Sequence, residues 1–239
     1  MGSCRRRAAW CSVPEGHSLE IASRRLRPLV GATVQEGPLS GATVVGVEPR
    51  GKNLLVHGDD GRSLHAHLGL HGSVRLRPAG TGRGRHVLRT AAGDAVIRGT
   101  IVRVLPSSRV RLALGPDLLR DFDEEEYLRR IRIVDRPVGE AIMDQRVVAG
   151  IGNVVKSEAL WECRIDPFTA VSALDDDHLR AVASVSGRIL REGVASGGRL
   201  PKRIYRRAGR PCPRCGTPIR SAPQGEQRRT SYWCPACCA

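Results

Sequence analysis

Four cysteines near the end of the chain have the spacing of a metal site. Cys212 and Cys215 form one Cys-x2-Cys pair, Cys234 and Cys237 form a second, and 18 residues separate the two pairs. Each pair places two thiolates on a tight turn, and two such turns supply the four sulfur ligands that a structural Zn²⁺ takes in tetrahedral geometry. The surrounding segment is rich in Gly, Pro and Arg, so metal binding would provide much of its folding energy. The spacing therefore predicts a zinc site, with Cys238 as a spare thiol that could compete as a ligand.

A dense run of basic residues precedes these cysteines. Residues 199–210 contain five arginines and Lys202. Such a run neutralises phosphates, and because it adjoins a zinc module we favour phosphate contacts over a merely solvated charged face. The whole chain has a formal net charge of +15, with 36 arginines and only three lysines. A polyanionic partner is expected, with nucleic acid ahead of an anionic membrane surface.

Two glycine-containing turns also offer groups that bind anions. The sequence Gly-Ile-Gly-Asn at 150–153 lies between two expected helices, where exposed backbone N–H groups would suit an anion, although ordinary helix–helix turns look the same. Lys52 follows a glycine between two expected strands, where a lone lysine reaches a phosphate or is simply exposed. His65, His67 and His71 alternate along one expected strand, but no Cys or carboxylate is spaced to complete a metal site. We interpret these histidines as surface or packing residues.

The hydrophobic pattern indicates a β-rich half followed by a helical half. A first helix is expected over 18–27, with Ser18 as its N-cap. Alternating segments and turn signals then predict antiparallel strands at 42–48, 54–57, 74–77, 86–89 and 101–105. After a linker around 106–116 the period becomes helical, with helices expected at 127–133, 137–148, 154–163 and 175–194. The first of these follows an Asp-x-x-Glu capping box. This order favours two domains.

Composition excludes several classes of protein. The chain has 239 residues, of which 41% are hydrophobic, so a folded core is expected and wholesale disorder is not. No run of about 18 apolar residues predicts a transmembrane helix. The first residues also lack the apolar region of a signal peptide. We therefore expect a cytoplasmic protein without a membrane partner, whose cysteines are reduced or bound to metal.

Several pieces of the sequence, taken in order, resemble one protein family. They are Pro-Glu-Gly-His at 14–17, Arg-Gly-Lys at 50–52, His-Leu-Gly-Leu-His-Gly at 67–72, Leu-Gly-Pro-Asp-Leu-Leu at 114–119, the run 143–153, and the cysteine module with Arg-Thr-Ser-Tyr-Trp-Cys at 229–234. The chain resembles the formamidopyrimidine-DNA glycosylase/endonuclease VIII family, in an endonuclease VIII-like branch similar to that of actinobacteria. In that family the run 143–153 corresponds to a helix–two-turn–helix, and the cysteine module to a zinc finger.

The resemblance implies a fold and a function. The fold is α+β and multidomain, with a tail at 1–13, a catalytic antiparallel β-sandwich with an N-terminal helix at 14–115, a helix–two-turn–helix domain at 116–200 and a Cys4 zinc finger at 201–239. DNA is expected in the cleft between the domains. The implied function is that of a bifunctional DNA glycosylase/AP lyase of base excision repair, a monomer that holds a structural Zn²⁺. Its partner is damaged DNA, at the nucleoid in the bacterial cytoplasm.

The resemblance also implies roles for individual residues. Pro14 would be the nucleophile, whose amine attacks C1′ of a flipped nucleotide, displaces the base and forms a Schiff base before the strand is cut by β,δ-elimination. Glu15 would be the acid that assists opening of the sugar ring. Lys52 would act with them, and it shares the clamping of phosphates around the nucleotide with Asn153 and Arg229. The resemblance places Leu70 where an apolar side chain fills the vacated stack.

The printed sequence conflicts with this chemistry at one position. Thirteen residues precede Pro14, and an internal proline nitrogen is a tertiary amide with no lone pair available for attack. We hypothesise that translation begins at Val13, through a GTG codon read as Met, and that removal of this Met frees Pro14. Cleavage of the tail is a rival. Genuine loss of lyase activity is another, and would leave a non-catalytic binder of damaged DNA. Composition alone also allows a basic zinc-ribbon protein of RNA or of the transcription machinery.

Three departures from the family pattern bear on specificity. Ser18 stands where the family often has a carboxylate. The family's Arg-Arg-Phe-Gly strand is not visible, and residues 97–100 are the nearest piece, which affects selection of the opposite base. The segment 195–203 is short, whereas enzymes for oxidised purines tend to have a longer loop there. We therefore predict that oxidised pyrimidines are preferred.

Overall fold

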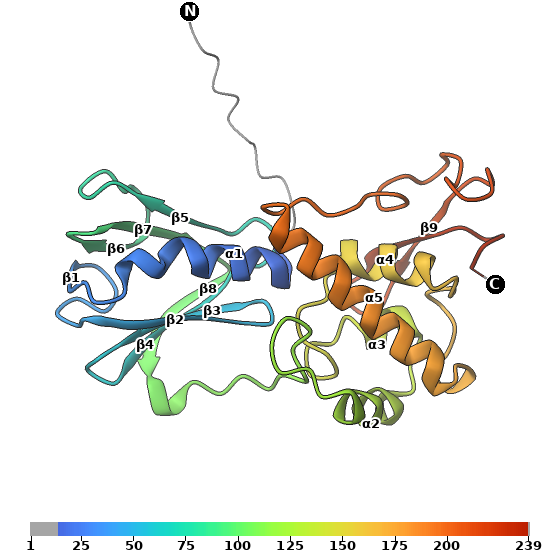
Figure 1. Cartoon of the computed structure of the whole chain (residues 1–239), viewed down its shortest axis with the longest axis horizontal. Coiled ribbons are helices and arrows are strands. Elements are labelled where there is room, and N and C mark those ends of the chain that lie inside the picture. The colour runs from blue at the N-terminus through green and yellow to red at the C-terminus, as the bar shows by residue number, and fades with distance from the viewer. Residues whose placement is uncertain (1–13, 239) are drawn as a thin grey trace, which may run out of the picture.

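Two four-stranded antiparallel sheets form the first half of the protein (Figure 1). The computed structural model describes residues 14–238. One sheet has the order β1-β6-β7-β5 and the other β2-β3-β4-β8. The strands are β1 (Val34–Glu36), β2 (Val44–Arg50), β3 (Asn53–Gly58), β4 (Arg62–His67), β5 (Ser73–Arg77), β6 (His86–Thr90), β7 (Gly93–Arg98) and β8 (Ile101–Pro106). The predicted antiparallel sandwich is confirmed, whereas the predicted tail and translation start at residues 1–13 lie outside the described residues.

The sandwich encloses a core made almost entirely of Leu, Val, Ile and Ala. Alternation places one face of a strand inside, so Val74 in β5 is buried while its neighbours Arg75 and Arg77 are exposed. Helix α1 (Gly16–Leu26) adds Leu19 and other apolar side chains to this core. The helix begins earlier than predicted, because Glu15 is its N-cap and the Ser18 hydroxyl instead accepts a hydrogen bond from the Glu15 N–H at 2.8 Å.

The second half contains helices packed on a separate apolar core. They are α2 (Glu124–Val134), α3 (Val138–Ala141), α4 (Asn153–Glu162) and α5 (Asp176–Ala195). The predicted capping box of α2 is present, since Asp123 Oδ1 accepts the Glu126 N–H at 3.0 Å. At the start of α5, Asp175 Oδ1 likewise accepts the His178 N–H at 2.8 Å. Short 3-10 turns lie elsewhere, at η1 (Arg27–Leu29), η2 (Ser107–Arg109) and η3 (Val171–Ala173).

The predicted helix over 137–148 is wrong, because only the single turn of α3 is helical there. Side chains beyond α3 bond to nearby backbone in place of the helical ladder. Asp144 Oδ1 accepts the Arg146 N–H at 3.0 Å, and Gln145 Oε1 accepts the Gly150 N–H at 3.0 Å. The chain therefore turns twice before α4 begins.

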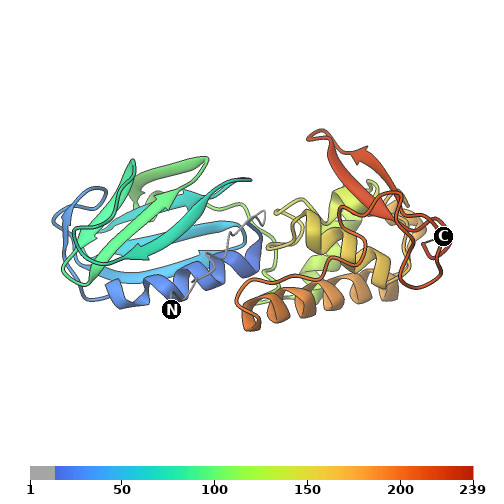
Figure 2. The ribbon, with the colours of Figure 1, turned by 90° about the horizontal axis from the view of Figure 1, so that it is seen from above.

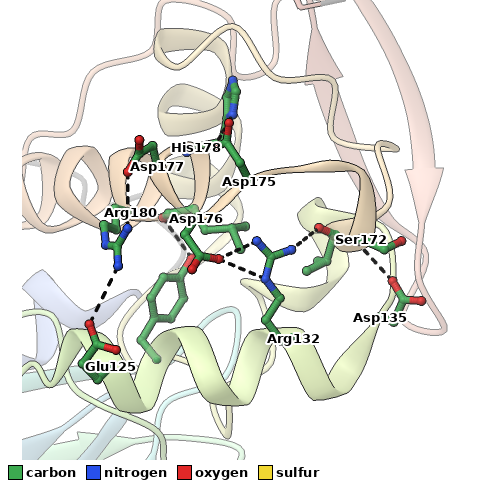
Figure 3. A network of polar contacts seen from close by, with 12 residues as sticks. Glu125, Arg132, Asp135, Ser172, Asp175, Asp176, Asp177, His178 and Arg180 are labelled. Carbon is green, nitrogen blue, oxygen red and sulfur yellow. Dashed lines mark hydrogen bonds and ion pairs between the residues drawn. The ribbon is translucent and has the colours of Figure 1, made fainter.

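Ion pairs hold α2 against the start of α5 on the outer side of the helical half (Figure 3). The Arg132 guanidinium contacts Asp176, and it also donates to the Val171 carbonyl at 2.9 Å. Arg180 lies 2.9 Å from Glu124 and 3.8 Å from Glu125. These pairs are exposed, so each contributes little beyond fixing how the two helices are aligned.

The last segment is a small hairpin module that packs on α4. Strands β9 (Arg220–Gln224) and β10 (Arg229–Trp233) pair antiparallel. Trp161 of α4 joins Ile204, Ile219 and three of the cysteines in a separate apolar cluster. The Arg214 guanidinium lies 4.4 Å from the centroid of the Trp161 ring, so the module is attached to α4 by stacking as well as by apolar contact.

The two halves meet where α1 contacts α5, and both views show one end of α1 next to one end of α5 (Figures 1 and 2). The Gly16 N–H donates to the Gly150 carbonyl at 2.9 Å across this junction. A Cβ on Gly16 would lie 2.9 Å from the Gly150 Cα, so glycine is required for this close approach. Within residues 14–238, no helix is long and apolar enough to cross a membrane.

Candidate active site

A cavity of about 460 Å³ lies at the junction of the two halves. Five of the predicted site residues line it, and they come from five separate parts of the chain. They are Pro14, Lys52, Leu70, Asn153 and Arg229. Residues that lie far apart in the sequence therefore come together at one place in the fold.

Glu15 lies behind the cavity wall with its carboxylate at the start of α4. It is fully buried, and its oxygens accept the backbone N–H groups of Val154 at 2.8 Å and Val155 at 3.3 Å. Burial raises the pKa of Glu15 to about 7, and the opposing effects of Lys52 and these N–H groups are smaller. A Cβ on Gly152 would lie 2.3 Å from the Glu15 Cδ, so only glycine leaves room for the carboxylate. The group is poised to exchange a proton near neutral pH.

The Glu15 carboxylate also occupies the anion site that the sequence predicts at the turn 150–153. The turn at 150–153 was predicted to present N–H groups to an anion, and in the structure the Glu15 carboxylate occupies that helix N-terminus. The anion is therefore part of the chain itself.

Lys52 provides a cation that lines the cavity and interacts with the Glu15 carboxylate. It sits in the β2–β3 turn, where the preceding Gly51 N–H donates to Asp117 Oδ2 at 2.8 Å. Burial lowers the pKa of Lys52 to about 8, with the Glu15 carboxylate opposing this shift and Arg229 adding to it. The ammonium group is still mostly protonated at neutral pH and is available to an anionic ligand.

Asn153 and Arg229 lie on facing elements, α4 and β10. The Asn153 Nδ2 donates to the Thr230 carbonyl at 2.8 Å, which leaves its second N–H free for a ligand. The buried Asn153 Oδ1 has no hydrogen-bond partner among residues 14–238. Within the same residues, the Arg229 guanidinium makes only long contacts, at 3.4 Å, with Gln227 Oε1. Both groups therefore keep hydrogen-bond donors for an incoming anion.

Leu70 is an apolar side chain at the mouth of the cavity, with 39% of its surface exposed. The expected single strand through the three histidines is wrong, because β4 ends at His67 and the chain then turns. His65 is buried and its Nε2 lies 2.9 Å from Asn53 Oδ1, as a packing residue would. His67 lines the cavity, and burial followed by the Lys52 charge lowers its pKa.

Comparison with known proteins assigns the family. Residues 17–103 match the model of the formamidopyrimidine-DNA glycosylase N-terminal domain, and residues 114–202 match the H2TH domain of the same glycosylase. A probable endonuclease 8 2 of Streptomyces coelicolor is 35% identical over 94% of each chain. The chain belongs to the formamidopyrimidine-DNA glycosylase family.

Other members are similar over nearly their whole length. The formamidopyrimidine-DNA glycosylase of Thermus thermophilus is 31% identical over 94% of this chain and 98% of its own. A crystal structure of the Thermus thermophilus protein gives a TM-score of 0.81 at 28% identity, again covering 94% and 98% of the two chains. The interpretation as a zinc-ribbon protein of RNA or transcription is therefore set aside, because both halves of this chain match glycosylase domains.

Sequence reasoning assigned no role to one residue of this glycosylase cavity. Lys156 of α4 is 1% exposed, lines the cavity and donates to the Ser231 hydroxyl at 2.8 Å. The Ser231 hydroxyl in turn donates to Gln224 Oε1 at 2.5 Å, so the chain of bonds joins α4 to both strands of the hairpin. Burial lowers the pKa of Lys156 to about 8. The available signal was that Lys156 is one of only three lysines in the sequence.

The four predicted metal ligands converge at the far end of this module. The Sγ atoms of Cys212, Cys215, Cys234 and Cys237 all lie within 4.8 Å of one another. Sulfurs bound at about 2.3 Å to one tetrahedral Zn²⁺ are roughly 3.8 Å apart, so the arrangement fits that ion. Cys238 is buried beside them but is not one of this group. The cysteine cluster is thus compatible with a zinc finger that holds β9 and β10 against the cavity.

Proposed function

We propose that the protein is a bifunctional DNA glycosylase/AP lyase of base excision repair, acting on oxidised bases in DNA. The observation that carries this is that Pro14 lines the same cavity as Lys52 and Arg229, beside a carboxyl group whose pKa is about 7. The names of the relatives, endonuclease 8 and formamidopyrimidine-DNA glycosylase, support the same class of reaction.

The proposed chemistry begins with Pro14 as a free secondary amine. Its lone pair bonds to C1′ of the flipped nucleotide, the glycosidic bond breaks, and the base leaves with the electron pair and takes up the proton that the proline nitrogen loses. Glu15 gives a proton to the sugar ring oxygen as the C1′–O bond opens, which leaves an iminium. Successive β- and δ-elimination then cut the strand on both sides of the sugar. A carboxyl group with a pKa of about 7 keeps its proton in a large fraction of molecules at neutral pH, whereas an ordinary glutamate is ionised there and has no proton to give.

Three side chains are proposed to hold the nucleotide during these steps. Lys52 and Arg229 supply positive charge from two different parts of the chain, and Asn153 supplies a neutral N–H, so a phosphate would be bound by three separate groups. Leu70 is proposed to fill the space that the flipped nucleotide leaves, as its exposed apolar side chain suits.

The active form is proposed to begin at Pro14, whether by initiation at position 13 and removal of Met or by removal of the preceding segment. Borohydride trapping tests this, because it reduces an iminium to a stable protein–DNA adduct. We expect an adduct on abasic-site DNA from the chain that begins at Pro14, and none from the chain as printed. Lys52→Ala in the shorter chain should still trap, which excludes Lys52 as the amine.

A second candidate function is a non-catalytic binder of damaged DNA, which the thirteen residues before Pro14 favour. Absence of an adduct from both forms, with binding to abasic-site DNA intact, would establish it. The preference for oxidised pyrimidines remains a proposal that rests on the short segment after α5. It is tested by comparing single-turnover release of an oxidised pyrimidine and of an oxidised purine from otherwise identical duplexes.

A further inference from the structure

A second, strongly basic hollow lies on the outer face of the sheet that contains β5 and β7. It has a volume of about 420 Å³, and four arginines line it together with small and apolar residues. The arginines are Arg75, Arg77, Arg83 and Arg98. We call this surface the arginine groove. None of its described lining residues carries a carboxylate.

Strand register places these arginines on one face. Arg75 lies opposite Val96 and Ser73 lies opposite Arg98, so the side chains alternate outward around a buried valine floor. Arg75 and Arg77 are two residues apart on β5, about 7 Å along the strand. A DNA strand advances about 3.4 Å along its axis per phosphate, so this spacing allows each arginine its own phosphate.

The positive charge of the groove is not neutralised within the protein. Residues 73–111 contain nine arginines and a single acidic residue, Asp94. The Asp94 side chain is buried and already pairs with Arg89 at 2.9 Å, while it also accepts the Gly82 N–H at 2.8 Å. Among residues 14–238 no ion pair involves Arg75 or Arg77. Holding like charges together without a counter-ion favours an anionic ligand.

A short stretch of chain links the groove to the candidate active site. Leu70 lines the cavity, and Ser73, three residues later, lines the groove. A Cβ on Gly69 would lie 1.9 Å from the Thr100 hydroxyl, so the loop between them is held tightly against the turn that follows Arg98. Figure 1 shows β5 in the upper layer of the sandwich, near the helical half.

From this short link and the charge of the groove we propose that the arginine groove binds the phosphate backbone of duplex DNA flanking the lesion. The inference rests on the proposed function, since it takes the DNA in the cavity as the same molecule. The groove extends the interface over the outer face of the sandwich and adds affinity that does not depend on the damaged base. It is a phosphate surface, so it contributes a salt-dependent term and no sequence preference.

The test uses the chain that begins at Pro14 and a fluorescent duplex of about 25 base pairs with a central tetrahydrofuran abasic analogue, and measures binding over a salt series. Arg75→Ala with Arg77→Ala should reduce the slope of log K against log salt by about 1.8, since each lost phosphate contact removes about 0.9. Arg75→Lys with Arg77→Lys should restore most of it. The matched control removes the same charge elsewhere, with Arg27→Ala and Arg109→Ala, two exposed arginines outside the groove.

A catalytic readout separates the groove from the cavity. At saturating enzyme the alanine pair should cut abasic-site DNA at the wild-type rate, with only KM raised. If the alanine pair and the control pair have equal slopes while Arg229→Ala still weakens binding, the groove proposal is overturned and the proposed function stands. If the wild-type protein does not bind the duplex, the proposed function itself fails. Normal DNA binding with loss of binding to polyglutamate would assign the groove to an acidic protein instead.

Discussion

Replacing Gly152 by alanine should displace the carboxyl group of Glu15 although Glu15 itself is unchanged. The backbone at Gly152 has φ −118° and ψ −170°, an extended conformation that alanine adopts without strain. The new Cβ would lie 2.3 Å from the Glu15 Cγ and Cδ, so the carboxylate must leave the N-terminus of α4. It then loses the N–H groups of Val154 and Val155. A hydrogen bond to a charged group is worth about 1.5–3 kcal/mol, and because one of the two is long we expect a total loss of about 3 kcal/mol.

Thermal unfolding and single-turnover strand cutting measure the two consequences. A loss of about 3 kcal/mol should lower Tm by roughly 6–12 °C in a chain of this size. Loss of a positioned proton donor should slow cutting about 100-fold in the chain that begins at Pro14. Gly46→Ala is the matched control, because its Cβ meets only an ordinary contact at 3.7 Å. In a Glu15→Ala background, Gly152→Ala should be nearly silent. Equal damage in both backgrounds, or a Gly152→Ala protein as stable as the control, would refute the assigned contact.

Three further perturbations probe the same region and the module beside it. The pKa of Lys156 is lowered to about 8, so the unfolded chain binds its proton more tightly and wild-type stability should rise between pH 8 and 10.5. Lys156→Met should reduce that rise in the free energy of unfolding by up to about 3 kcal/mol. Lys202→Met, at an exposed lysine, should leave the rise unchanged. Urea unfolding at several pH values measures both. Arg229→Ala should weaken binding to abasic-site DNA about tenfold by fluorescence anisotropy, whereas Arg228→Ala, outside the cavity, should weaken it no more than another surface charge does. The purified protein should contain one zinc per chain by elemental analysis. Removing the zinc with a chelator should abolish binding to abasic-site DNA, because β9 and β10 then lose their attachment. An unchanged affinity for this DNA would count against the role of the module.

Local signals predicted the elements that local chemistry determines. The Asp-x-x-Glu box predicted the start of α2, because a cap needs only the residues of one turn. The cysteine spacing likewise predicted a cluster that the structure contains. Strand alternation was sufficient for the sandwich, since one face of each strand must be buried.

Contacts between distant parts of the chain could not be predicted in this way. Glu15 caps α4 from 139 residues away, and no pattern in either segment predicts that contact. The stretch after α3 had the apolar content of a helix, but Asp144 and Gln145 bond to backbone and turn the chain. Family resemblance gathered Pro14 and Arg229 into one site. It gave no reason to include Lys156, whose burial depends on how α4 packs against the hairpin.

The position of Glu15 makes its pKa depend on contact between the two halves of the protein. The residue belongs to the β half, whereas the groups that enclose it come from the start of α4 in the helical half. Its raised pKa exists only while the two halves are in contact, because separation would return the carboxyl to water and to an ordinary glutamate value. Neither half expressed alone would carry a proton at neutral pH on this residue. Protonation of Glu15 at neutral pH therefore requires that the β half and the helical half be assembled.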